Sequence, residues 1–416
     1  MNSETKDISK ISLYYTIFIA ALPIFSVYAS GIPGFTAGDL LLVIFFLYRL
    51  INGVTTNSLK INRRTFPVLW LIICIPLITS VSVLGGQQDI DSYSIVIRVV
   101  RRVFYYLAVV LVSNEWFDGE LGKKSIVLLG KIGAIYMFVQ YLAYYGMNII
   151  LTGFLPFLEV YHENYSQIDY ELIYSRMFRP TSFLLEPAHI SRFLIIPLII
   201  LMFEQKFKYR WFWAFVISAA ILASTSGTGL IAVDLVWFLW IVVGLTGQNG
   251  KKLPVSYLFL YITVVVVVII ALNTDVVQAA LFRITSSDLM DVNTASGARF
   301  RGYLEYFQLD YWGIILGRGY GNIPDITYLP IWFSGASYML YGTGIVGFLV
   351  CITMFVSLFV KNKNMISKFL CIVFAFLFFT DDSFMSHVAV LYFSFICMSC
   401  DKVSDEVNNE NPVLDG

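Results

Sequence analysis

Residues 66–84 read FPVLWLIICIPLITSVSVL, nineteen consecutive residues without a charge, and they follow closely on Lys60, Arg63 and Arg64. A helix needs roughly 20 apolar residues to cross the hydrocarbon core of a bilayer. Basic residues beside such a run favour the cytoplasmic side. The stretch therefore predicts a membrane-spanning helix that begins at the cytoplasmic face.

The composition of the whole chain excludes several other classes of protein. Of the 416 residues, 58% are hydrophobic and 13% are charged, whereas soluble domains carry about 25% charged residues. The 28 basic residues balance the 28 acidic ones, so there is no basic excess to attract a nucleic acid. The five cysteines all lie in apolar runs, which does not fit a secreted disulfide scaffold.

Apolar runs of comparable length recur along the chain. They predict an all-α, polytopic membrane bundle of about 12 transmembrane helices. We expect a single transmembrane domain over residues 1–400 and a short polar cytoplasmic tail at 401–416. Two long loops are expected on the outer side, at about 148–186 and 273–335. The predicted spans are 11–30, 38–53, 66–84, 95–113, 125–147, 187–203, 211–226, 228–246, 254–272, 336–360, 366–380 and 387–400.

The lysines indicate the orientation of this bundle. Between the predicted spans they lie in connections that share one side of the membrane if both termini lie there too. Because positive charge collects in cytoplasmic loops, the N and C termini are expected to be cytoplasmic. The residues concerned are Lys60, Lys123, Lys124, Lys206, Lys208, Lys251, Lys252, Lys361, Lys363 and Lys368.

The outer half of the chain carries arginines and no lysine. A guanidinium group offers a planar fork of donors that matches phosphate and carboxylate groups, so this face is expected to hold an anion. The alternative is that the arginines pair with loop acids such as Asp169 and Glu305. The ten arginines are Arg98, Arg101, Arg102, Arg176, Arg179, Arg192, Arg283, Arg299, Arg301 and Arg318.

Three of these arginines lie within the predicted fourth span. The i, i+3, i+4 spacing of Arg98, Arg101 and Arg102 places them on one helical face. Charges inside a span are costly and usually face a cavity or a partner. The alternative is that their side chains reach back to the outer headgroups.

Three motifs follow in order on the outer side: RPTSFLLEPAHISR at 179–192, SGARFRGYLEYF at 296–307 continuing to LGRGYGN at 316–322, and SYMLYGTGIVG at 337–347. Together with the number of spans and the large second loop, they resemble the superfamily of O-antigen polymerases and O-antigen ligases. The shared pattern is an outer arginine before a Phe/Glu-Pro turn, then a loop with arginine, aromatic residues and a glycine-rich turn.

The resemblance implies a metal-independent, membrane-embedded C-type glycosyltransferase fold without cofactors. Its members act on undecaprenyl-pyrophosphate-linked sugars at the periplasmic face of the bacterial inner membrane, and a polymerase would move a growing glycan onto a new lipid-linked repeat unit. By motif position, pyrophosphate binding falls on Arg179 and on Arg299 or Arg301, with Arg98 and Arg102 in support. The implied partners are the lipid-linked oligosaccharide, the bilayer, a chain-length regulator and a flippase, with no nucleic acid.

Several residues are candidates for the acceptor side of that reaction. Glu186 and His189, within the first motif, and His162 before it are candidate general bases, although an acid before proline also suits a helix start. Asp382 is expected to bind acceptor sugar or to pair with an outer arginine, and Tyr303 is expected to stack on a sugar ring or to pack between helices. The histidines lack the spacing of a zinc site, so no metal is expected.

Two other functions stay open. Ligases of the superfamily carry a His-Asn pair before the span that here begins at 336, but this chain reads Gly335, Ala336, Ser337 at that place. A flippase or another transporter would also use arginines in a span, although such proteins usually show internal repeats. The pattern Gly342-x-Gly344-x-x-Gly347 opens an apolar run with no strand before it, which favours close helix packing over a dinucleotide site.

Overall fold

The computed structural model is mostly helical over the residues it describes, and within them no strand occurs. Two isolated antiparallel bridges join Tyr28 to Val160 and Ala29 to Thr36. The predicted all-α class is confirmed for these residues. The predicted tail at 401–416 and most of the predicted ninth span lie outside them. The described residues are 3–32, 34–56, 61, 63–85, 92–161, 178–246, 262, 266, 295–322 and 333–398.

The first half of the chain forms a series of helices within the residues that the structure describes. In order they are α1 (Ser3–Phe25), α2 (Ala37–Thr55), α3 (Phe66–Leu84), α4 (Ser92–Leu107), the π-helix η1 (Ala108–Ser113), α5 (Asn114–Trp116), α6 (Gly119–Met147) and α8 (Pro187–Phe203). The second half continues with α9 (Arg210–Ala223), α10 (Gly227–Thr246), α13 (Ala295–Phe307), α14 (Tyr311–Leu316), α15 (Gly335–Lys361), α16 (Met365–Thr380), the 3-10 helix η2 (Ser383–Met385) and α17 (Val388–Met398).

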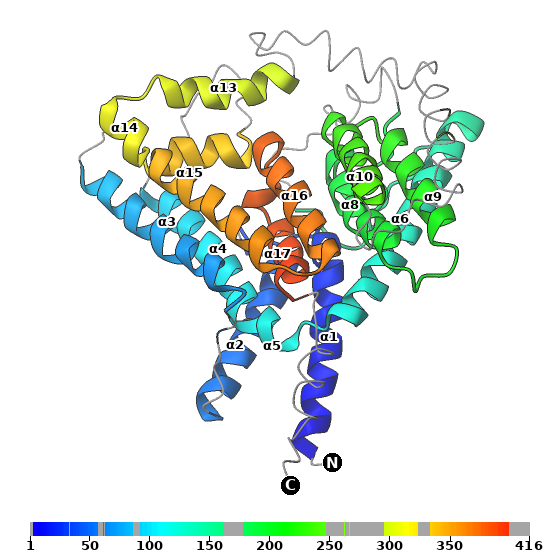
Figure 1. Ribbon diagram of the computed structural model, residues 1–416, viewed down its shortest axis with the longest axis horizontal. Coiled ribbons are helices and arrows are strands. Elements are labelled where there is room, and N and C mark those ends of the chain that lie inside the picture. The colour runs from blue at the N-terminus through cyan, green and yellow to red at the C-terminus, as the bar shows by residue number, and fades with distance from the viewer. Residues whose placement is uncertain are drawn as a thin grey trace.

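Helix α16 lies at the centre of the arrangement. It packs against α15 on one side, against α8 and α10 on another, and against α17. Helix α13 lies across the end of the bundle opposite to the start of α1, as Figure 1 shows. The turn from Asp381 to His387, which joins α16 to α17, therefore sits between the two groups of helices that flank α16.

Length and apolar character support a membrane-embedded protein. Among the described residues, five helices are long and apolar enough to cross a bilayer, in the ranges Ala37–Thr55, Phe66–Leu84, Gly119–Met147, Gly227–Gly244 and Gly335–Lys361. Large hydrophobic side chains also point outward on many helices, among them Leu142, Val54 and Leu77. A water-soluble monomer rarely exposes so many large apolar side chains, whereas a lipid-facing surface carries them.

Each predicted span that the structure describes overlaps a helix, but α1 ends at Phe25, before the predicted end at residue 30, and α9 ends at Ala223, before residue 226. Shorter apolar helices fall on five further predicted spans, at Lys10–Phe25, Pro187–Phe203, Arg210–Ala223, Met365–Thr380 and Val388–Cys397. Helix α4 and the π-helix that continues it fall on the predicted fourth span. The count of about 12 crossing helices stays a prediction. The second predicted loop contains α13 and α14 in its described part.

The glycines of the third motif interrupt a helix. Gly344 has φ 63° inside α15, a left-handed conformation that a residue with a side chain rarely adopts. A Cβ atom there would lie 2.2 Å from the carbonyl oxygen of Ile315, and one on Gly317 would lie 2.4 Å from the backbone of Gly342. The sequence favours close helix packing at these glycines. The structure shows such close packing: the glycines let α15 approach the end of α14 and the backbone that follows it, at residues 315–320.

We expect Gly344→Ala to lower the free energy of unfolding by at least about 2 kcal/mol, because the new Cβ atom meets the Ile315 carbonyl and the left-handed backbone is strained. Gly146→Ala is the matched control, since a Cβ atom at Gly146 meets nothing within 4 Å. Unfolding of both variants in mixed detergent micelles measures the difference. Equal stability of the two variants would contradict the close fit at Gly344.

Candidate functional site

A buried arginine, Arg192 on α8, organises the polar cluster at the centre of the molecule. Its Nη1 donates to the carboxylates of Asp381 and Asp382 and, at 3.0 Å, to the hydroxyl of Ser383. Its Nε donates to the carbonyl of Ala188 at 3.2 Å. The side chains of Arg192 and Asp381 are 4% and 3% exposed, whereas that of Asp382 is 56% exposed. Arg192 and Asp381 are therefore buried, whereas the Asp382 side chain is accessible from outside the cluster.

The local sequence explains why these groups meet. Pro187 begins α8 and Glu186 is its N-cap residue, so Arg192 falls one and a half turns into the helix. On the other side, Asp381 follows the last residue of α16 and its carbonyl accepts from the amide of Gly335 at 2.7 Å. Asp381, at the end of α16, thereby joins two other helix starts. Its carboxylate binds Arg192 near the start of α8, and its backbone carbonyl binds the start of α15.

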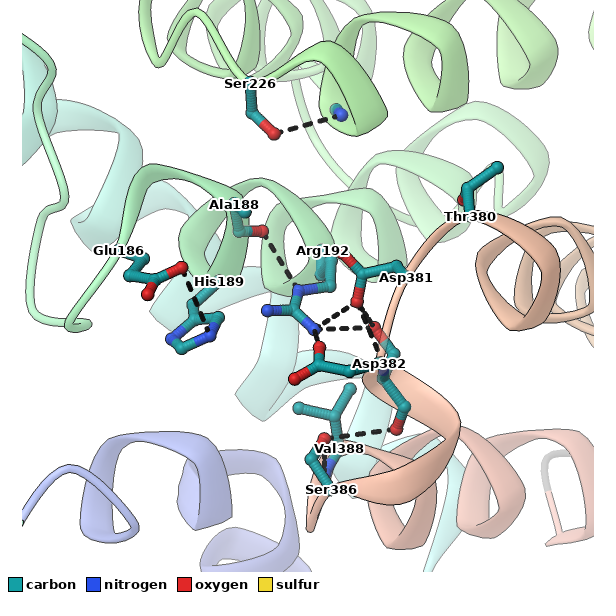
Figure 2. Close-up of polar contacts among 12 residues, drawn as sticks. Glu186, Ala188, His189, Arg192, Ser226, Thr380, Asp381, Asp382, Ser386 and Val388 are labelled. Carbon is teal, nitrogen blue, oxygen red and sulfur yellow. Dashed lines mark hydrogen bonds and ion pairs between the residues drawn. The ribbon is translucent and has the colours of Figure 1, made fainter. Parts of the chain in front are cut away.

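Two of the three predicted general bases lie beside this cluster, and the third, His162, lies outside the described residues. The His189 Nε2 is 3.7 Å from a carboxylate oxygen of Glu186, one turn apart on the helix. Figure 2 shows Arg192 between Glu186 and His189 on one side and Asp381 and Asp382 on the other. The structure therefore brings Glu186, His189 and Asp382 together. Their catalytic and sugar-binding roles stay predictions.

A cavity of about 140 Å³ opens at this cluster. It is lined by His189 and Arg192 of α8, by Asp382, Ser386 and His387 of the α16–α17 turn, and by Pro23, Ser26 and Val27 at the end of α1. The Ser26 hydroxyl is buried and has no hydrogen-bond partner among the described residues. The cavity thus offers a hydroxyl, a carboxylate, an imidazole and a guanidinium group to a small polar ligand.

The charge of this cluster shapes what it accepts. Burial raises the pKa of the Asp381 carboxyl to about 6, against the opposing effect of the Arg192 guanidinium. At neutral pH two carboxylates share one arginine, and Glu186 lies close by. The cluster therefore repels an anion and suits a neutral, hydroxyl-bearing group. Among the described residues, no group of three or more His, Cys, Asp or Glu side chains can hold a metal ion.

A second buried arginine holds the same turn from the opposite side. Arg102 of α4 donates to the Tyr320 hydroxyl at 2.6 Å, to the Phe384 carbonyl at 2.8 Å and to the Met385 carbonyl. Arg102 is thus an arginine of the predicted fourth span whose guanidinium group donates to other groups of the protein. Its contacts give Arg102 a structural role, and its predicted part in pyrophosphate binding stays untested.

The other two arginines of that span point to different surroundings. Arg98 is exposed and donates to the carbonyl of Gly321 at 2.6 Å. Arg101 lies over the ring of Phe35, with its Cζ 5.6 Å from the ring centroid. Two hydrogen bonds therefore hold the glycine-rich turn of the second motif against α4. Arg98 donates to the Gly321 carbonyl, and Arg102 donates to the Tyr320 hydroxyl. The expectation that these charges face partners is met at Arg98 and Arg102.

Arg179, the leading candidate for pyrophosphate binding, lies at the turn between α9 and α10. Its Nε donates to the Thr225 hydroxyl at 2.8 Å and to the Ser224 carbonyl at 3.3 Å. Thr225 itself has φ 52°. The guanidinium group is only partly buried, so a ligand can approach it beside this turn.

Helix α13 carries the remaining predicted residues. Arg301 pairs with Glu305 at 3.1 Å across one helical turn, and both side chains are partly exposed. Tyr303 hydrogen-bonds the Ser334 hydroxyl at 3.0 Å and donates to the Phe379 carbonyl at 3.0 Å. Tyr303 therefore ties α13 to α15 and α16. The backbone of Arg299 belongs to α13, but its side chain lies outside the described part of the structure.

The sequence predicts Arg192 only as one of ten outer arginines that hold an anion or pair with an acid, and it predicts that Asp382 binds sugar or pairs with an outer arginine. The pairing is confirmed, since Arg192 pairs with both Asp381 and Asp382. An arginine six residues into an otherwise apolar helix carries a large desolvation cost, and the adjacent acids Asp381 and Asp382 lie between two apolar runs. These two signals together point to a buried pair. The sequence does not predict that Ser26 lines the cavity, because nothing in it places the end of α1 beside α8.

The chain was also compared with known proteins. No protein-family model matches it. A search of the curated proteins finds no match either.

Proposed function

We propose that the protein is a membrane glycosyltransferase that polymerises polyprenyl-pyrophosphate-linked repeat units into a surface polysaccharide of the O-antigen type. The proposal places the reaction at the outer face of a bacterial inner membrane, in a bundle of about 12 spans. It rests on the resemblance of the three outer motifs and on the polar cavity at Arg192.

The cavity is the observation that carries the proposal. Its lining comes from the end of α1, the start of α8 and the turn between α16 and α17. The predicted topology puts all of these at the outer ends of their spans. An acid, an imidazole and a buried arginine at that level suit the activation of a hydroxyl at the membrane surface. A hydroxyl acceptor is what a glycan-extending enzyme must activate.

The proposed reaction gives a task to the carboxylate of Asp382 and to two arginines outside the cavity lining. The acceptor sugar hydroxyl attacks the anomeric carbon of the donor glycan and its proton passes to the carboxylate of Asp382. A new glycosidic C–O bond forms while the bond from the anomeric carbon to the pyrophosphate oxygen breaks. The electron pair of that bond leaves with the polyprenyl pyrophosphate. Fixed guanidinium groups stabilise the growing negative charge, a role that we assign to Arg179 and Arg301.

Replacing Arg179 or Arg301 by alanine is expected to lower the rate of polymer formation at least about 100-fold, because each change removes a cation from the leaving group. The protein should remain in the membrane in normal amount. Gel analysis of glycan lengths from cells or vesicles measures the effect. Arg210→Ala is the matched control, since Arg210 begins α9 at the opposite end from the Ser224–Ser226 turn. Polymer of wild-type length from both variants would contradict the assignment.

A second candidate function is transport of the lipid-linked oligosaccharide across the bilayer. One observation favours it: Asp381 and Arg192 are buried among helices, and buried acids near histidines mark proton pathways in transporters. The assay separates the two functions. A transporter moves an unchanged repeat unit between leaflets, whereas a polymerase lengthens it. The ligase alternative lacks support, because the segment before Tyr338 carries no histidine.

A further inference from the structure

An apolar groove between α3 and α15 lies away from the polar cavity. It has a volume of about 400 Å³, within the range of small-molecule sites. Its lining comes from the start of α3 and from the second half of α15: Phe66, Pro67, Trp70, Val346, Leu349, Val350, Thr353, Met354, Ser357 and Lys361. Seven of these ten residues are apolar, and the other three are Thr353, Ser357 and Lys361.

The lining residues of the groove extend along α15. From Val346 to Lys361 it follows fifteen residues of α15, which at 1.5 Å per residue is about 22 Å. Half of a bilayer hydrocarbon core is about 15 Å thick. A tilted groove of this length therefore fits one extended acyl chain of a single leaflet.

Charge gathers at one end of the groove only. Lys361 lines it there, and Lys363 and the Arg63–Arg64 pair lie within three residues of the two helix ends that form its mouth. Phe66 and Trp70 lie edge to face at the same end, with ring centroids 6.2 Å apart, and both are half exposed. Aromatic rings beside basic residues are typical of the level of lipid headgroups. The predicted topology places this end at the cytoplasmic face.

We propose that the groove binds one anionic phospholipid of the cytoplasmic leaflet. One acyl chain lies along α15 between Leu349 and Met354, and the phosphate group lies at Lys361. The apolar lining selects a hydrocarbon chain, and the basic mouth selects a negative headgroup over a neutral or zwitterionic one. The site is independent of the glycosyltransferase proposal, since it uses none of the same residues and opens at the other side of the membrane.

Trp70 provides the test, because its ring lines the groove. The purified protein is reconstituted into phosphatidylcholine vesicles that contain an equal mole fraction of either brominated phosphatidylglycerol or brominated phosphatidylcholine. Quenching of the Trp70 fluorescence is obtained as the difference between the wild type and Trp70→Phe. The brominated anionic lipid should quench Trp70 more strongly. Lys361→Gln should lower this preference about fivefold.

Two further variants keep the test decisive. Ser357→Phe narrows the groove without changing charge, and it should reduce quenching by the anionic lipid. Lys206 is an exposed lysine that the predicted topology also places on the cytoplasmic side, and Lys206→Gln should leave the preference unchanged. Equal quenching by the two lipids overturns the proposal. Weak quenching by both lipids overturns it as well, since it would mean that a second protein copy covers the groove.

Discussion

Arg192→Met should lower the free energy of unfolding at neutral pH by about 3–5 kcal/mol, because it leaves the buried Asp381 carboxylate without its cation. The loss should shrink as the pH falls. A carboxyl group whose pKa is higher in the folded than in the unfolded state, where it is about 3.9, stabilises the fold at low pH and loses that contribution as the pH rises. The Asp381 pKa is already raised to about 6 beside Arg192.

The double variant Arg192→Met, Asp381→Asn provides the matched control. It removes both charges, so it should recover much of the stability that Arg192→Met alone loses, and its unfolding should depend little on pH. Unfolding with sodium dodecyl sulfate in mixed micelles, at two values of pH on either side of 6, measures all three proteins. If the single variant were as stable as the wild type at high pH, the central role of Arg192 in the fold would be wrong.

Asp382→Asn should abolish glycan extension, with a fall in turnover of at least about 100-fold, because the amide cannot accept the proton of the acceptor hydroxyl. Its stability should change little, since the Asp382 side chain is 56% exposed and Asp381 still pairs with Arg192. Turnover is measured with purified protein in liposomes, and stability with the unfolding assay above.

Glu186→Gln separates the two acids near His189. Glu186 lies outside the lining of the cavity, so its amide variant should keep most of the activity. The reverse pattern, with an active Asp382→Asn and an inactive Glu186→Gln, would assign the base to Glu186. Asp382 would then serve only to bind Arg192.

Much of the fold follows from apolar runs and helix signals. The run at 66–84 predicts the bounds of α3, and the Glu186-Pro187 pair suits the start of α8 where the structure places it. Such local patterns work because a helix satisfies its own backbone hydrogen bonds and its apolar length is set by the bilayer. The interruption of α15 at Gly344 was not predicted, since it depends on the 315–320 segment packing there.

The site was predicted only in part, because most of its residues are brought together by tertiary packing. Glu186 and His189 are neighbours on one helix, so their proximity follows from the sequence. Arg192 and Asp381 are 189 residues apart, and no local pattern joins them. Likewise, the spacing of three arginines on one helical face does not reveal that Arg102 donates hydrogen bonds to the carbonyls of Phe384 and Met385.

The most direct test of the account uses the purified protein in liposomes with a defined undecaprenyl-pyrophosphate-linked repeat unit, analysed by gel. We predict a ladder of rising glycan length that disappears in Asp382→Asn and in Arg179→Ala. A repeat unit that stays single while its lipid crosses the bilayer would contradict the account, and it would make the protein a transporter.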